Sequence, residues 1–372
     1  MGFSLYPFSF QEESKMALTD AEKHNKFTLS KIPATVKLAY FDSDPIAYRG
    51  AFAVEKTKYR FTNSETFEES PPFLSAKDAK SWLDGQQDIA ESIGIEFRKQ
   101  DWVRYDWKEP LSVEEAIKAT QDVLQAYIKA SGVHEDDWMG FLTQRGVEKT
   151  KDLPGLEHQY QGNRSGFTPT HLDATRQHLI DKSQMHLLSD GFEADAAVIA
   201  MGERKGKRAV ILSLDKDLRQ LMGGYMLDMS YDKAPLIFNT VDNPLGDVWR
   251  CPIKSKPKQP PKYVGCGFKW LCYQALAGDP SDGYYGISGV GGAAIIKLLD
   301  GCETIHQCLD AIYALYKKKF PEGYTYTSWD GTEQHRTPEE LMTQHFMLPY
   351  QERSMDDVFS FEKYGWSFNM NG

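Results

Sequence analysis

The sequence predicts an α/β fold with a mostly parallel central sheet and flanking helices. Apolar segments of strand length recur along the chain, and segments of helical period separate them, as in a parallel sheet. Two of the apolar segments, 35–41 and 209–214, end directly in acidic residues. Because the carboxyl ends of parallel strands meet at one edge of a sheet, this order also predicts an acidic cluster at that edge.

Periodicity places the regular elements in order along the chain. Apolar segments predict strands at 35–41, 138–142 and 209–214. Segments of helical period predict helices at 113–128, 172–188, 196–201, 268–276 and 295–299. Ser112, with Glu115 three residues later, is the N-cap expected for the first of these helices.

The remaining segments are expected to be irregular or inserted. Residues 1–34 are polar and predict an N-terminal extension. Residues 50–110 carry mixed aromatics and turn signals, and predict an elaboration with a hairpin. Residues 145–170 are polar, basic and rich in glycine, and the Pro- and Lys-rich segment 251–263 predicts a loop or linker.

Composition limits the classes of function that the chain can have. With 372 residues, 41% of them hydrophobic, it can bury a substantial core and could hold two domains. The formal net charge of −10 argues against a generally basic surface for nucleic acid, although local basic clusters could follow phosphates. Because no run of about 18 apolar residues occurs, we expect no membrane association and a cytoplasmic location.

Seven acidic residues are candidate metal ligands because they fall beside the expected elements. They are Asp42, Glu193, Asp195, Asp215, Asp217, Asp279 and Asp282. In an extended strand, residues two apart face the same way, which predicts that Asp215 and Asp217 project into one cleft. The same spacing applies to Asp42 and Asp44.

Helical geometry constrains the other acids. Two residues of a helix in that spacing lie about 200° apart, so Glu193 should precede the helical turn that contains Asp195. Asp279 and Asp282 are three residues apart, which places both on one face of a helical turn, where they can hold one cation.

Grouped carboxylates are unfavourable without cations. Like charges about 4 Å apart repel by roughly 1 kcal/mol in water and by roughly 4 kcal/mol at an effective dielectric constant of about 20. A single Asp-x-Asp pair is ordinarily a turn or a helix cap. Four acidic clusters beside expected elements predict a site for hard divalent cations instead.

A glycine-rich segment follows the last two acids and precedes the helix at 295–299. It contains Gly286, Gly289, Gly291 and Gly292, and Lys297 lies on the helix itself. Because glycine lacks Cβ, a phosphodiester could approach the N–H groups at the start of this helix, where the helix dipole also favours an anion. Acidic clusters beside such a segment indicate a metal-dependent enzyme that acts on nucleic acid.

In their order, these motifs resemble those of the 5′ nuclease family of flap endonucleases and 5′–3′ exonucleases, most closely its bacteriophage exonucleases. Phe41-Asp42-Ser43-Asp44 resembles the first strand with its metal-binding Asp. Glu193-Ala194-Asp195 resembles the Glu-Ala-Asp-Asp motif, and the segment 213–217 resembles Ser-x-Asp-x-Asp. The segment 278–291 resembles Gly-Asp-x-Ser-Asp and the helix-three-turn-helix hairpin, and 160–164 resembles the Tyr-Lys-x-x-Arg arch stretch.

The resemblance implies a fold, a reaction and a substrate. It implies a PIN-like 5′ nuclease core at 35–230, with the insertion at 50–110 and an arch at 145–180, followed by a helix-three-turn-helix DNA-binding region and C-terminal extension at 231–372. The implied reaction is hydrolysis of phosphodiesters by a two-metal-ion mechanism, with the seven acids holding two Mg²⁺ ions, for which Mn²⁺ can substitute.

The implied substrate is duplex DNA with a 5′ end or a 5′ single-stranded tail, with RNA in hybrids left open, and the implied setting is phage DNA replication or processing. A monomer is expected. Contacts with nucleic acid are expected at Arg145, Lys149, Lys151, Tyr160, Arg164, Gly286, Gly289, Gly291, Gly292 and Lys297.

Three residues depart from the family pattern. Ala196 stands where the family has a second Asp, Gln144 where relatives carry an Asp after the strand, and Gln161 where the arch has a lysine. These departures leave open a catalytically weakened protein that binds branched DNA. A second alternative is an aspartyl-phosphate phosphohydrolase of the haloacid-dehalogenase type, whose nucleophile motif residues 40–44 also resemble.

Overall fold

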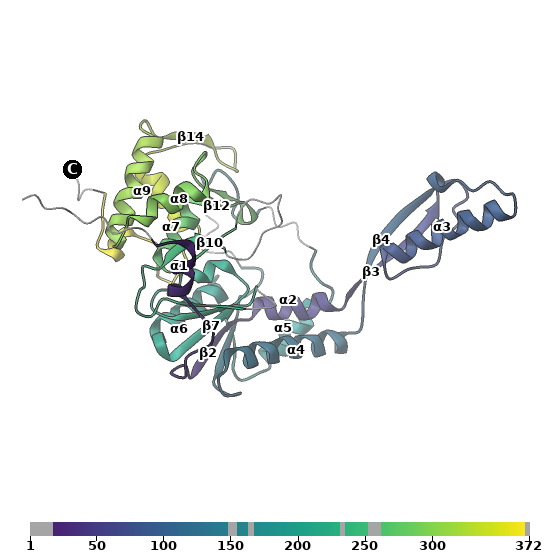
Figure 1. Cartoon of the computed structure of the whole chain (residues 1–372), viewed down its shortest axis with the longest axis horizontal. Coiled ribbons are helices and arrows are strands. Elements are labelled where there is room, and N and C mark those ends of the chain that lie inside the picture. The colour runs from purple at the N-terminus through teal and green to yellow at the C-terminus, as the bar shows by residue number, and fades with distance from the viewer. Residues whose placement is uncertain (1–17, 148–154, 163–166, 231–234, 252–261, 369–372) are drawn as a thin grey trace, which may run out of the picture.

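The expected mostly parallel sheet with flanking helices is confirmed. A computed structural model of the chain describes residues 18–147, 155–162, 167–230, 235–251 and 262–368 (Figure 1). Its main sheet has the strand order β1-β9-β8-β7-β2-β5-β6, in which the five strands from β8 to β6 are parallel and β9 and β1 are antiparallel to their neighbours. The strands are β1 (Thr28–Leu29), β2 (Leu38–Asp42), β5 (Trp138–Leu142), β6 (Met185–Leu187), β7 (Ala209–Ser213), β8 (Tyr225–Asp228) and β9 (Leu236–Asn239).

Helices cover both faces of this sheet. Phe41 of β2 packs on one face with α2 (Asp44–Ala53), α4 (Val113–Ser131) and α5 (Leu172–Ile180), whereas Tyr40 packs on the other with α6 (Ala194–Lys205). Alternate residues of a strand point to opposite faces, so apolar side chains at nearly every position of β2 and β7 fit a strand that is buried on both sides. The capping box expected between Ser112 and Glu115 begins α4.

Two expectations for the flanking segments are wrong. Within the extension at 1–34, the described residues form α1 (Asp20–Phe27), which a capping box of Thr19 and Glu22 begins, and β1, which joins the sheet. The helix expected over 172–188 ends at Ile180, and Met185–Leu187 instead pairs with β5 as β6. Pairing with a neighbouring strand outweighed the local helical period at Met185–Leu187. Sequence periodicity describes only one segment at a time and does not include such pairing.

The expected elaboration at 50–110 is a hairpin with its own helix. Strands β3 (Glu55–Asn63) and β4 (Trp102–Pro110) pair over their whole length, and α3 (Ala76–Ser92) and the 3₁₀ turn η1 (Lys99–Asp101) lie between them in sequence. A separate core of Phe61, Ala79 and Leu83 holds α3 against the hairpin. This insertion projects away from the rest of the molecule, beyond the ends of α2 and α4 (Figure 1).

The C-terminal third forms a helical region with the largest apolar core of the described residues. Its helices are α7 (Phe268–Ala277), α8 (Gly292–Asp300), α9 (Ile305–Lys319) and α10 (Pro338–Met347). Short strand pairs accompany them: β10 (Asp247–Arg250) with β11 (Tyr263–Cys266), β12 (Gly278–Asp279) with β13 (Tyr284–Tyr285), and β14 (Tyr324–Thr327) with β15 (Glu333–Arg336). The remaining 3₁₀ turns are η2 (Gly206–Arg208), η3 (Lys216–Gln220), η4 (Pro280–Asp282) and η5 (Phe361–Tyr364).

The expected division of the chain at 230 stays a prediction. Strand β9 follows that position and still belongs to the main sheet. Most of the loop expected at 251–263 lies outside the described residues. In the described part of the chain, no helix combines the length and apolar character that crossing a membrane requires.

Candidate active site

Four of the seven predicted acids line one cavity at the carboxyl edge of the sheet. The cavity has a volume of about 880 Å³. Asp42 ends β2, Asp215 follows β7, and Glu193 and Asp195 lie at the start of α6. Glu193 has an extended backbone and is the N-cap of that helix, as its spacing from Asp195 predicted.

Asp42 is the most enclosed of these carboxylates. Its side chain is 6% exposed, and Ser213 donates a hydrogen bond of 2.9 Å from Oγ to its Oδ2. Burial, followed by the nearby carboxylates of Asp44 and Asp195, raises the pKa of Asp42 well above its usual value. The charged form of Asp42 therefore needs a nearby cation to compensate it, which is what we expect of a carboxylate that binds a metal ion.

Asp44 lines the same cavity as Asp42, as their spacing predicted, although not through the extended geometry of a strand. The strand ends at Asp42, and Asp44 is the first residue of α2. There its carboxylate pairs with Arg176 and accepts a 3.1 Å hydrogen bond from the backbone N–H of Thr143. Thr143 Oγ1 in turn accepts from Ala194 N at 2.9 Å, so this network fixes the start of the helix that carries the cavity acids.

Asp215 and Asp217 also differ from the predicted arrangement. Strand β7 ends at Ser213, and Asp215 caps η3 by accepting a 2.8 Å hydrogen bond from Asp217 N. Asp217 is 5% exposed and accepts a hydrogen bond from Gln274 of α7. Of the two, only Asp215 is among the residues that line the cavity, and the extended geometry required for a shared face ends two residues earlier.

Asp279 and Asp282 form the second acidic group together with Asp217. Asp279 belongs to β12 and Asp282 to η4, in which residues three apart lie above one another. Burial raises the pKa of Asp279, but hydrogen bonds from Lys216 and Ser281 outweigh it and hold that pKa below its usual value. Lys216 pairs with Asp279, a contact that sequence spacing did not predict.

Tyr160 lies between the two acidic groups. Burial, and then the charges of Glu193 and Asp282, raise the pKa of its hydroxyl well above 10, the ordinary value. Its ring is only 7% exposed and packs with Leu156 and Tyr284. Tyr160 therefore packs as a core residue here, and its contact with nucleic acid stays a prediction.

The four glycines of the hairpin have different roles. A Cβ on Gly286 would lie 2.0 Å from the carbonyl oxygen of Leu276, and one on Gly292 would lie 2.4 Å from the Tyr263 ring, so both allow close packing. Gly289 takes a positive φ of 74°. Gly291 is the N-cap of α8 and has no atom within 4 Å of an added Cβ, which leaves space for a phosphate there.

The predicted cations are only partly placed. Arg145 lines the cavity and pairs with Asp173, and Lys297 is exposed on α8. Lys149, Lys151 and Arg164 lie outside the described residues. Arg176, which is 6% exposed in the cavity wall, was missed because no local motif marks it.

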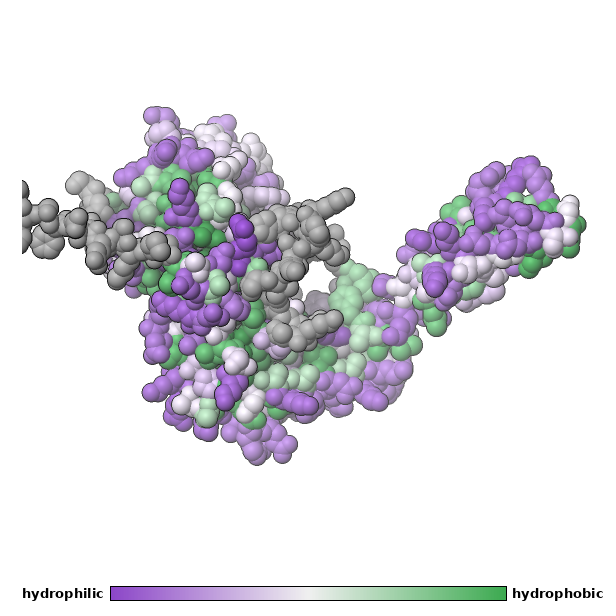
Figure 2. Space-filling view, in the orientation of Figure 1, coloured by the Kyte–Doolittle hydropathy of each residue, from purple (hydrophilic) through white to green (hydrophobic). Residues whose placement is uncertain are grey.

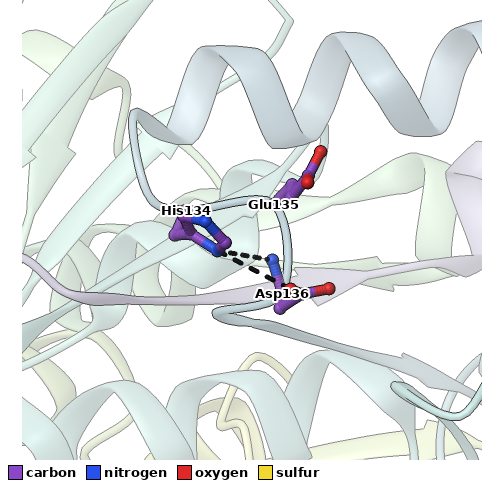
Figure 3. Close-up of side chains that lie close together, drawn as sticks. All are labelled: His134, Glu135 and Asp136. Carbon is purple, nitrogen blue, oxygen red and sulfur yellow. Dashed lines mark hydrogen bonds and ion pairs between the residues drawn. The ribbon is translucent and has the colours of Figure 1, made fainter.

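A second group with metal-binding side chains lies in the loop between α4 and β5. It consists of the consecutive residues His134, Glu135 and Asp136, whose ligand atoms lie within 4.8 Å of one another (Figure 3). All three are exposed, and Asp136 N donates to His134 Nδ1 at 3.4 Å. Exposed neighbours in one loop are common without a metal, so this group supports no site.

Comparison with known proteins identifies similar sequences. No protein-family model matches the chain. It is 28% identical over 194 residues to the thermostable DNA polymerase I of Thermus thermophilus, covering 46% of this chain and 20% of the polymerase. It is also 28% identical over 165 residues to DNA polymerase I of Deinococcus radiodurans, covering 42% of this chain and 15% of that protein. The chain thus spans about a fifth or less of the length of these relatives.

Solved structures of bacteriophage T5 enzymes also align with the chain. The T5 5′-exonuclease with bound zinc has a TM-score of 0.38 and 13% identity, covering 84% of this chain and 89% of that chain. The T5 flap endonuclease in a complex with DNA and metal ions has a TM-score of 0.38 and 11% identity, with the same coverage. These neighbours are named as 5′ nucleases, the family that the motifs resemble.

Proposed function

We propose that the chain is a 5′ nuclease that hydrolyses phosphodiesters in DNA with two divalent metal ions, Mg²⁺ or Mn²⁺. The observation that carries this proposal is that Asp42, Glu193, Asp195 and Asp215 line one cavity. Asp217, Asp279 and Asp282 lie nearby, because their charges act together with that of Asp215 on Tyr284. The sequence similarity of the chain to DNA polymerase I, which we assign to the 5′–3′ exonuclease part of that protein, supports the same activity. The proposed substrate is duplex DNA with a 5′ end or 5′ tail, cut by a monomer in phage DNA replication or processing.

The donor set fits hard divalent ions. All seven side chains offer carboxylate oxygens, the ligands that Mg²⁺ and Mn²⁺ prefer. Burial of Asp42 beside other carboxylates raises its pKa, so a bound cation would restore its charged form. When bound, such ions supply an activated water and stabilise the leaving oxygen in an in-line displacement at phosphorus.

The protein's own groups would position the substrate. Asp42, Glu193, Asp195 and Asp215 would hold one ion, and the group of Asp217, Asp279 and Asp282 would hold the other directly or through water. The Arg145 guanidinium in the cavity wall can contact a phosphate oxygen, because its pairing with Asp173 is exposed. The open N-terminus of α8 at Gly291 would hold the duplex backbone without reading its sequence.

The test is cleavage of a 5′-tailed duplex in Mg²⁺ by the native chain and by Asp215→Asn. Cleavage should fall by at least about a thousandfold in the variant, because a ligand of the reacting ions is lost, while duplex binding stays within a few-fold. Asp136→Asn removes the same charge from an exposed loop and should cleave normally. Full turnover in excess chelator, or equal activity of the two variants, would refute the proposal.

The branched-DNA-binding alternative rests on the cavity's own composition. Gln144 lines the cavity where relatives carry a carboxylate, which would weaken ion binding. Binding of tailed duplex with no cleavage at any Mg²⁺ or Mn²⁺ concentration would favour it. Trapping of a covalent aspartyl phosphate on the chain would favour the aspartyl-phosphate alternative instead.

A further inference from the structure

The β3–β4 ribbon presents one face that no helix covers among the described residues. Directly opposed residues of an antiparallel pair share a face, so the register assigns every side chain of the ribbon. One face carries Phe61 and Trp102, which pack on α3. The other, here the outer face, carries Lys56, Lys58, Arg60, Thr62, Val103, Tyr105, Trp107 and Glu109.

The outer face combines cations with aromatic rings. Arg60 lies over Trp107, with its guanidinium carbon 5.5 Å from the ring centroid, and the neighbouring Tyr105 is 55% exposed. In the described part of the chain, neither aromatic ring belongs to an apolar core. Exposed aromatic rings among cations are the chemistry that binds unpaired nucleic acid, by base stacking and phosphate contacts.

Acidic neighbours pair with two cations of the outer face, but these cations can still bind a phosphate. Lys58 pairs with Glu109 at 2.7 Å, and Arg60 pairs with Glu69. The two carboxylates are 49% and 52% exposed. Exposed pairs of this kind contribute only about 0–1 kcal/mol each, so a phosphate can take the place of either carboxylate.

The outer face begins at the rim of the acidic cavity. Lys56 donates a 2.9 Å hydrogen bond from Nζ to the carbonyl oxygen of Ala53, which lines the cavity. Tyr48 and Phe52 of α2 line the same cavity and stack with ring centroids 6.2 Å apart. The ring of Phe52 also lies 6.2 Å from that of Phe167, which is 50% exposed. Figure 2 shows pale hydrophobic atoms at this end of α2, beside the hydrophilic base of the ribbon.

We propose that the outer face binds an unpaired DNA strand that leaves the cavity, and so extends the nuclease site along the insertion. The inference rests on the proposed function, because it assigns the strand to that enzyme's substrate. An unpaired strand is favoured over a duplex, since only unpaired bases expose faces that Tyr105 and Trp107 can stack on. A strand of nine residues extends about 30 Å, so only a long tail reaches the whole face.

The test measures binding by the full chain in chelator, where no cleavage occurs. Two duplexes are compared, one with a long oligothymidylate tail and one with a tail of a few nucleotides. The double variant Arg60→Ala/Trp107→Ala removes one cation and one aromatic ring from the outer face. The control Lys80→Ala/Phe67→Ala removes the same kinds of group from exposed positions elsewhere on the insertion.

The outer-face variant should bind the long tail at least about fivefold more weakly, since each stacked base contributes about 1–3 kcal/mol. Its affinity for the short tail should change less than about twofold. The slope of the logarithm of its binding constant for the long tail against the logarithm of salt concentration should fall by the equivalent of about one phosphate contact. The control should match the native chain. Lys56→Glu/Lys58→Glu, which reverses two charges of the outer face and keeps both aromatic rings, should give the same pattern if the double variant fails to fold.

Equal losses on both tails, or a loss only on the short tail, would overturn the inference. Equal behaviour of the outer-face variant and the control would also overturn it. Because binding is measured without metal, the two proposals fail separately. If the native chain cuts DNA and the outer-face variant binds long tails normally, the proposed function stands and the outer-face site is wrong. If the variant loses long-tail binding and the native chain never cuts, the outer-face site stands and the proposed function is wrong.

Discussion

At the residue scale, the two acidic groups are balanced by different means. Asp279 has Lys216 and Ser281 as hydrogen-bond donors, which keep its pKa low despite burial. Asp42 is surrounded by other carboxylates, and its hydrogen bond from Ser213 offsets only part of the effect of burial. The group around Asp42 is therefore where a divalent cation changes the electrostatic energy most.

Gly291 separates a role in phosphate binding from a role in packing. Its φ of −79° suits any residue, and an added Cβ would meet no neighbouring atom. We expect Gly291→Val to keep the melting temperature within about 2 °C while raising the Kd for duplex DNA several-fold, because the branched side chain covers the exposed N–H groups.

Gly292→Val is the matched control, since its Cβ would collide with the Tyr263 ring. That variant should lose thermal stability. If Gly291→Val instead destabilises the protein and leaves its affinity for DNA unchanged, the phosphate role of the hairpin is wrong.

Ala196 stands where the motif that the chain resembles has a second Asp, so restoring that Asp tests whether the site gains a metal ligand. The residue is 1% exposed on α6, next to Asp195. An added carboxylate there would be buried, so Ala196→Asp should lower the free energy of unfolding by about 2 kcal/mol or more in chelator. Saturating Mg²⁺ should recover part of this loss, because a new ligand oxygen favours cation binding. An unchanged melting temperature in chelator would contradict this expectation, and Ala196→Ser provides a control of similar size without the charge.

At the element scale, packing of α10 on α9 encloses a neutral histidine. His345 of α10 lies with Nδ1 2.7 Å from the hydroxyl oxygen of Tyr316 on α9. Burial lowers the pKa of His345 from 6.5 to about 4. Between these pH values the unfolded chain binds the proton and the folded chain does not, so stability falls as the pH falls.

This difference contributes at most about 3 kcal/mol, complete above pH 6.5 and lost as the pH approaches about 4. We expect His345→Gln, which can still accept from Tyr316, to lose less stability than the native chain over that interval. Denaturant unfolding at several pH values measures the two slopes. Parallel curves for the two proteins would show that His345 does not titrate on unfolding.

At the scale of the whole molecule, the insertion is a unit added to the main sheet and its helices, which we call the frame. Glu55 and Pro110 are opposed at its base, so a short linker can join them, and the insertion's core of Phe61, Ala79 and Leu83 is separate from the others. Replacing 56–109 by a Gly-Ser linker should therefore keep cleavage of short-tailed duplexes and weaken binding of long tails. Cooperative unfolding at an unchanged temperature would confirm that the frame remains folded. Loss of the native fold would show that the insertion is an integral part of the structure.

The sequence by itself determined the parallel sheet, the capped helix α4 and the positions of the acids beside strand and helix ends. These features depend on local period, capping chemistry and chain order, which a single segment carries. It also fixed that Glu193 must precede α6, because helical geometry allows no alternative.

Only the tertiary structure decided which of these acids share a cavity. Asp44 pairs with Arg176, Asp217 contacts Gln274, and Tyr160 is buried, three contacts that no local motif indicates. The same holds for β6, whose pairing with β5 replaced an expected helical turn. Long-range contacts determine these outcomes, because the energy of a buried charge or a paired strand depends on residues far away in the chain.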